Sequence, residues 1–179
     1  MTTAAPRDRF VDAFAQVERV IEERWGIPVV ITDVPSPFTG DLDGAEIRVD
    51  HDLSAEDALF IIVHLFGHTV QWNVSPAARA IAKHPGPWTP ELLAELRAYE
   101  REACQYSLTL FHQAGVRDLD QWLADFSACD YAYLEHVFTR GDKPPFRSFW
   151  RPDQPALAPL PIPDFTPTRW WSRWEGVVV

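Results

Sequence analysis

Residues 61–72 read IIVHLFGHTVQW, and they are the most informative stretch of the sequence. His64 and His68 are four residues apart, so on an α-helix both imidazoles project from one face, one turn apart. At about 100° per residue, these histidines and Gln71 fall within about 60° of one another, with Gly67 beside them. Burying two imidazoles in an apolar helix is costly unless each has a partner, and a divalent metal would satisfy both. The alternative is a pair of packed core histidines.

Apolar spacing and turn residues predict the elements around this stretch. We expect helices over 7–25, 54–72, 89–113 and 119–140, and short strands over 29–31 and 45–50, with a loop between the strands. Residues 59–70 are apolar nearly all round, which predicts the buried central helix. Ser54 with Asp57 resembles a capping box, Thr89 precedes a proline at a helix start, and Asp118 with Gln121 predicts another cap. Pro76 and the prolines at 85 and 87 are expected to break the chain.

The C-terminal segment has an unusual composition. Residues 143–168 hold half of the 16 prolines, which excludes a regular helix or a central strand. A disordered tail rarely carries many aromatic residues, so an ordered, extended wrap is expected. A lid over the metal cleft (residues 143–174) and an interface for a protein partner are the alternatives. The valines at 177–179 suggest an edge strand. The aromatic residues are Phe146, Phe149, Trp150, Phe165, Trp170, Trp171 and Trp174.

The third metal ligand is expected on the helix over 89–113. Its apolar stripe, spaced for a face toward the core, is Leu92, Leu96, Tyr99, Ala103, Tyr106 and Leu110. Glu100 lies at the edge of this stripe and can reach inward, whereas Glu102 is expected to face solvent or the tail. Cys104, one turn from Glu100, could join or replace the carboxylate as a ligand, or be a small buried hydrophobe.

These two segments resemble a known family. His64 to His68 resembles the HExxH motif of gluzincin-like metallopeptidases, and more closely the HELGH signature of the ImmA/IrrE family. That family continues with a helix reading roughly ExxANxFAxxLL; here residues 100–111 read EREACQYSLTLF, in which Glu100 and Ala103 match. The resemblance covers about residues 54–113. It implies a zincin-like core with His64, His68 and Glu100 as ligands of a divalent metal, zinc first and iron or copper as alternatives.

The chain also departs from this family. The catalytic glutamate of the family follows the first histidine, where this chain has Leu65. In such peptidases that glutamate moves a proton from the zinc-bound water to the leaving amine, and leucine can do neither. Cys104 stands where the family has asparagine. Ordinary peptidase activity is therefore not expected.

Three functions remain open. The first is a non-proteolytic metal-dependent enzyme acting on a small molecule. The second is a pseudo-peptidase that binds a protein partner, and the third is a hydrolase with another base, for which Glu102 is the nearest carboxylate. Other polar residues are candidates for supporting or acid–base roles, although no spacing pattern singles them out. Gln71 is the best of them, because it lies on the same helix face as His68, one turn further on. They are Gln71, Tyr99, Tyr106, His51, His112 and His136.

Composition limits the class of protein. Length and apolar content suit one α+β, mostly helical domain: a helical core over 1–142 and a tail over 143–179 packed on it. The net charge is −10 and there is no basic run, so nucleic acid is not an expected partner. Residues 140–179 are mildly basic and could fold back on the acidic body, or simply be solvated. Two cysteines, no signal peptide and no membrane span predict a cytoplasmic protein. Oligomeric state is open.

Overall fold

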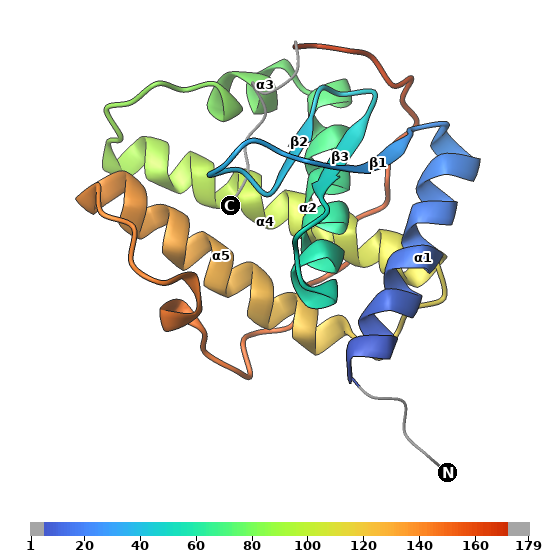
Figure 1. The fold of residues 1–179 in the computed structure, drawn as a ribbon. Coiled ribbons are helices and arrows are strands. Elements are labelled where there is room, and N and C mark those ends of the chain that lie inside the picture. Colours follow the sequence, from blue (N-terminus) through green and yellow to red (C-terminus); the bar gives the residue numbers. More distant parts are fainter. Residues whose placement is uncertain (1–5, 172–179) are drawn as a thin grey trace.

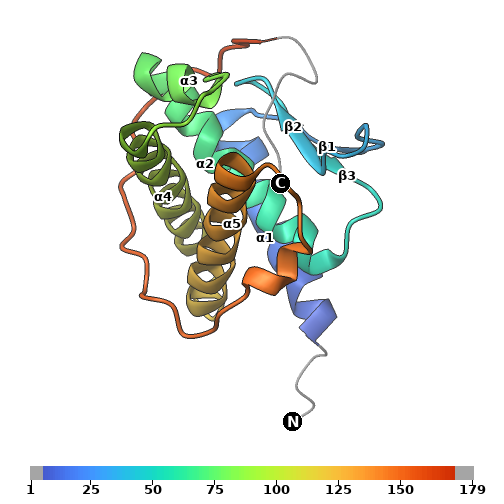
Figure 2. The same cartoon turned by 90° about the vertical axis from the view of Figure 1, so that its left-hand side faces the viewer.

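The computed structural model describes residues 6–171, and its architecture is α+β and mainly helical. Figures 1 and 2 together show one central helix with a small sheet on one side and two long helices on the other. In chain order the elements are α1 (Pro6–Trp25), β1 (Val29–Thr32), β2 (Gly40–Leu42), β3 (Ile47–Asp50), α2 (Ala55–Val74), α3 (Pro76–Ala82), α4 (Pro90–Gln113), α5 (Asp120–Arg140) and the 3-10 turn η1 (Phe146–Phe149). None of the helices in this described range is long and apolar enough to cross a membrane.

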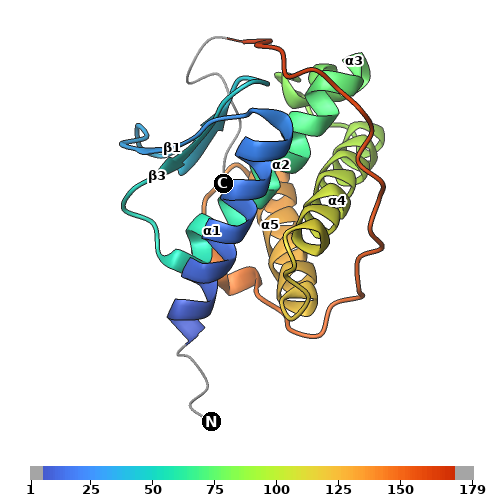
Figure 3. The same ribbon diagram turned by 90° about the vertical axis from the view of Figure 1, so that its right-hand side faces the viewer.

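Helix α2 is the centre of the core, as its apolar sequence predicts. Every residue from Leu59 to Trp72 is buried. Helix α1 packs along it, α4 crosses it on the other side, and α5 packs on α4 (Figures 1 and 3). Ser54 caps the start of the helix: its hydroxyl accepts a hydrogen bond from the Asp57 amide and donates one to the Asp57 carboxylate. Half of the expected capping box is therefore formed.

The sheet has the strand order β1-β3-β2. β1 runs parallel to β3, while β2 runs antiparallel to it. Gly40 lies directly over α2: a Cβ there would be 2.7 Å from the Ile61 side chain and 2.9 Å from that of Leu65. Strand β2 was expected to be loop. Three residues with a glycine carry no periodic signal, and only pairing with β3 makes them a strand.

Helix α2 ends just before Pro76, as expected, but Pro76 also begins the short helix α3, which was not predicted; there Ser75 accepts a hydrogen bond from the Ala78 amide. One other local prediction was wrong. The expected Asp118 cap of α5 is absent; the helix has no side-chain cap, and the Asp118 carboxylate binds Arg9 at 2.6 and 2.7 Å. A long-range ion pair therefore takes the place of the expected hydrogen bond to the helix end.

The tail is extended, as predicted, and follows the outer side of α4 (Figures 2 and 3). The Leu160 amide donates to the Gln105 carbonyl, and the Leu160 carbonyl accepts from the Thr109 hydroxyl at 2.5 Å. Its basic residues do bind the acidic body: Arg147 pairs with both acidic residues of the first turn of α2, and Arg169 with Asp43. The tail aromatics packed against the core are Phe146, Trp150, Phe165 and Trp171. Trp174 and the suggested strand at 177–179 lie outside the described residues.

Candidate metal centre

The two histidines of α2 lie side by side in the core. His64 and His68 are 4% and 2% exposed, and their Nε2 atoms are 3.0 Å apart. Their rings are nearly perpendicular, at 82°. Each ring is stacked against an aromatic neighbour: Phe60 lies on His64 and Tyr99 on His68. The helical spacing therefore brings both Nε2 lone pairs to one point, as the sequence predicts.

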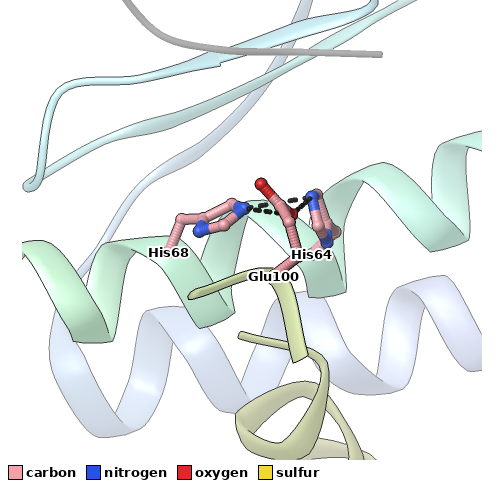
Figure 4. Close-up of side chains that lie close together, drawn as sticks. All are labelled: His64, His68 and Glu100. Carbon is pink, nitrogen blue, oxygen red and sulfur yellow. Dashed lines mark hydrogen bonds and ion pairs between the residues drawn. The ribbon is translucent and has the colours of Figure 1, made fainter. Parts of the chain in front are cut away.

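Glu100 reaches this point from α4, as predicted. Its Oε2 atom is 3.2 Å from Nε2 of His68 and 3.3 Å from Nε2 of His64, and Figure 4 shows the carboxylate between the two rings. Burial alone would raise the pKa of Glu100, but the two imidazoles outweigh it and lower the pKa to about 2. The carboxylate is thus held in its ionised form, the form that binds a cation.

The spacing of these three atoms fits a metal ion. Two atoms bound to a tetrahedral zinc at about 2.0–2.1 Å each lie about 3.3 Å apart. The three measured separations among His64, His68 and Glu100 are 3.0, 3.2 and 3.3 Å. All three side chains are buried and together form a group that could hold a metal ion. The donor set, two imidazoles and one carboxylate, suits zinc and also iron.

A close helix crossing brings Glu100 within reach. At Gly67, a Cβ would lie only 2.2 Å from the Ala103 carbonyl oxygen. Ala103 follows Glu100 by about one turn of α4. Only glycine at residue 67 lets the backbones of α2 and α4 approach this closely, and this approach places a carboxylate of α4 against two imidazoles of α2.

Gln71 orients His68. The Oε1 atom of Gln71 can only accept, so Nδ1 of His68 is the donor of their 2.9 Å hydrogen bond, and Nε2 of the neutral ring keeps its lone pair for a metal. The Nε2 atom of Gln71 donates to the Tyr99 carbonyl and, at 2.6 Å, to the Glu102 carboxylate. Glu102 was expected to face solvent or the tail; instead it is half-buried and fixes the amide that supports His68.

Cys104 does not lie on the ligand side of His64. Its Sγ atom is 3.8 Å from Nδ1, the ring nitrogen that faces away from His68 and Glu100. The thiol is buried, and burial raises its pKa above the ordinary value. The alternative in which Cys104 joins or replaces Glu100 does not fit this arrangement. Cys104 lies behind His64, much as Gln71 lies behind His68.

The remaining candidates take structural positions. The Tyr99 hydroxyl accepts a hydrogen bond from the Trp72 indole at 2.8 Å, and burial raises its pKa well above the ordinary value. Tyr106 is buried and makes no hydrogen bond with the described residues. The other candidate histidines pair with nearby aspartates away from the centre, and they are His51, His112 and His136.

Asp130, on α5, is part of the centre and was not predicted. Its Oδ2 atom is 3.6 Å from Nε2 of His64, and the residue is 1% exposed. Its Oδ1 atom is buried and has no hydrogen-bond partner in the described part of the chain. Burial raises the pKa of Asp130 to about 7; nearby Glu100 adds to the effect and His64 opposes it. The one sequence signal was its spacing: Phe126, Asp130 and Leu134 share a helix face that is otherwise apolar.

Leu65 occupies the position of the glutamate that the resembled family uses. It is fully buried, and its side chain lies against Gly40 of β2. No carboxylate therefore reaches the centre from the residue after His64. Asp130 approaches instead from α5, on the side of His64.

A cavity of about 360 Å³ opens beside Glu100 and Tyr99. Its wall is mainly apolar and is formed by the loop before β2, the end of α3, α4 and α5. A second cavity, of about 340 Å³, reaches Glu100 and Cys104 from the opposite side, where tail residues 154–157 line it. The apolar side chains of the first cavity include Phe38, Ile81, Trp88, Leu96, Leu134 and Phe138.

Comparisons of the chain with protein-family models, with curated proteins and with solved structures found no match.

Proposed function

We propose that this protein is a metal-dependent, non-proteolytic enzyme that acts on a small molecule. The observation that carries the proposal is the buried group of His64, His68 and Glu100, whose ligand atoms are 3.0–3.3 Å apart beside a cavity of about 360 Å³. Each imidazole is stacked and supported from behind, as expected for metal ligands. Two imidazoles and one carboxylate that converge on one point form a donor set that a divalent metal ion prefers.

We propose that the scaffold is zincin-like and resembles that of the ImmA/IrrE family. Three features support it: a histidine-bearing helix packed under a small sheet, a following helix that supplies the carboxylate, and a glycine at their crossing. The order of these elements is the one the resemblance implies. Two buried free cysteines fit the cytoplasmic location that we also propose.

In this function His64, His68 and Glu100 hold the metal, and Gln71 fixes the ring of His68. Zinc is the first choice, with iron or copper as alternatives. A divalent ion held there would supply Lewis-acid chemistry to a substrate oxygen. Proteolysis is not proposed, because Leu65 cannot move a proton between a nucleophile and a leaving amine.

The cavity suggests the kind of substrate. Its volume of about 360 Å³ is at the lower end of the range typical of small-molecule sites, and its wall is mainly apolar. Glu100 is the one wall residue that belongs to the ligand group. We therefore propose a compact substrate with an apolar body and a polar group directed at the metal. We propose no nucleic-acid or membrane partner.

The test is elemental analysis of protein purified without a histidine tag, beside His64→Ala and Glu100→Ala. His136→Ala is the matched control, because this helical histidine binds Asp142 away from the centre. We expect close to one metal per chain in the parent and the control, and none in the two ligand variants. A parent that holds no metal even after reconstitution would contradict the proposal and favour the alternative, a pseudo-peptidase that binds a protein partner.

A further inference from the structure

Asp130 carries an unmet hydrogen-bonding capacity inside the core. The residue is 1% exposed, and its Oδ1 atom has no partner among the described residues. Buried carboxylate oxygens are nearly always satisfied, and one left unpaired is costly. The other oxygen of the same carboxylate, Oδ2, lies 3.6 Å from Nε2 of His64 in the candidate metal centre.

The described neighbours of Asp130 in the centre do not supply the missing donor. Its Oδ2 atom faces Nε2 of His64 at 3.6 Å, which is too long for a hydrogen bond. When Nε2 binds a metal it carries no proton and cannot donate. The next group, Glu100, is itself an acceptor in its ionised form. With a metal bound, neither His64 nor Glu100 can donate a hydrogen bond to Asp130.

Asp130 flanks the ligand group rather than belonging to it. The ligand atoms of His64, His68 and Glu100 all lie within 4.8 Å of one another, and Asp130 is not part of that group. Two atoms on one tetrahedral ion lie about 3.3 Å apart, which is the spacing of the other three. Asp130 is thus placed to contact a molecule bound at the centre, on the side of His64.

We infer that Asp130 accepts a hydrogen bond from the molecule bound at the metal centre, and so supplies the carboxylate that Leu65 does not. This inference rests on the proposed function. It restricts the bound group to one that carries a hydrogen-bond donor next to its metal-binding oxygen, such as a water, a hydroxyl or a hydroxamic acid. The third open function is a hydrolase with a different base. For that function, Asp130 is a candidate base in place of Glu102, which already accepts a hydrogen bond from Gln71.

The experiment compares two small metal ligands on the full chain loaded with Co²⁺, with binding followed by visible absorption. Acetohydroxamic acid carries a donor beside its metal-binding oxygen, whereas azide at neutral pH carries no hydrogen. Asp130→Ala should weaken acetohydroxamic acid about 10- to 100-fold, the size expected for a hydrogen bond to a charged group. Azide should bind equally well or more tightly, because a negative charge has been removed.

Two further variants control for folding and charge. Asp130→Asn keeps the shape of the side chain and an acceptor oxygen. Its affinity for acetohydroxamic acid should therefore fall less than that of Asp130→Ala. Glu135→Gln removes one charge from an exposed position on the same helix, where the carboxylate pairs with Arg97, and should change neither affinity. Circular dichroism checks that each variant is folded.

The outcomes separate this inference from the proposed function. A parent that binds no Co²⁺ would refute both. Unchanged affinity for acetohydroxamic acid in a folded Asp130→Ala protein would refute the inference alone. Loss of Co²⁺ from both Asp130 variants, as severe as in Glu100→Ala, would also refute it, because Asp130 would then be a direct ligand.

Discussion

Replacing Gly67 with alanine tests the helix crossing on which the centre depends. A Cβ at this residue would lie 2.2 Å from the carbonyl oxygen of Ala103, 2.7 Å from its carbonyl carbon and 2.9 Å from its Cα. Normal non-bonded contacts need more than 3 Å, so α2 and α4 must separate by roughly 1 Å. The atoms that are met belong to the backbone and cannot rotate away.

Two effects of opposite sign act on the free energy of unfolding of Gly67→Ala. Helix propensity favours alanine over glycine by about 1 kcal/mol. Overpacking costs about 1–3 kcal/mol, and backbone contacts place this site at the upper end. We expect a net destabilisation of about 2 kcal/mol, which lowers Tm by about 4–8 °C for a chain of this size.

The same substitution should weaken the metal site. Ala103 lies about one turn from Glu100, so a separation of roughly 1 Å would carry the carboxylate away from His64 and His68, now 3.3 and 3.2 Å distant. Zinc affinity should fall more than tenfold. Mutating a residue that hydrogen-bonds a metal ligand typically lowers affinity by at least this much. Urea unfolding and competition with a chromophoric chelator measure the two effects.

A double variant sharpens this test. Gly67→Ala combined with Ala103→Gly should not recover stability, because removing the Ala103 side chain leaves the clashing backbone atoms in place. A Gly67→Ala protein that is as stable as the parent or more stable, as propensity alone would give, would refute the packing argument. Unchanged zinc affinity would show that the crossing does not position Glu100.

Three further predictions concern charge and the tail. In metal-free protein at pH 8, Asp130→Asn should raise the free energy of unfolding by about 1–3 kcal/mol, because it removes an unsatisfied buried charge; urea unfolding with a chelator present measures it, and a loss of stability would contradict it. The Arg9 guanidinium lowers the pKa of Asp118 to about 2. The contribution of this ion pair to the free energy of unfolding is therefore complete above about pH 4 and is lost as the pH falls toward 2. Because the Asp118 side chain is 59% exposed, that contribution should not exceed about 1 kcal/mol, and Asp118→Asn should remove this part of the acid-unfolding curve. Asn73 accepts hydrogen bonds from the Thr168 amide and the Trp170 indole, so Asn73→Ala should speed tryptic cleavage after residue 169 several-fold, seen by mass spectrometry, without changing zinc affinity. Equal cleavage rates would show that Asn73 does not hold the tail.

What the sequence determined by itself was local. The spacing of His64 and His68 places both imidazoles on one helix face whatever surrounds them, because helix geometry depends on the backbone alone. Apolar periodicity and turn residues likewise predicted α1, α2, α4 and α5 to within a few residues. Glu100 could be singled out because it lies at the edge of an apolar stripe that had to face the core.

What only the tertiary structure decided was which groups from different elements meet. No local pattern shows that Asp130 of α5 lies 3.6 Å from His64, or that Glu102 turns inward to accept from Gln71. Strand β2 exists only because β3 pairs with it, and Asp118 leaves its helix end because Arg9 approaches from α1. Helix periodicity fixes the direction of a side chain about its own axis, but the distance to the next helix is set by packing, here by a glycine at residue 67.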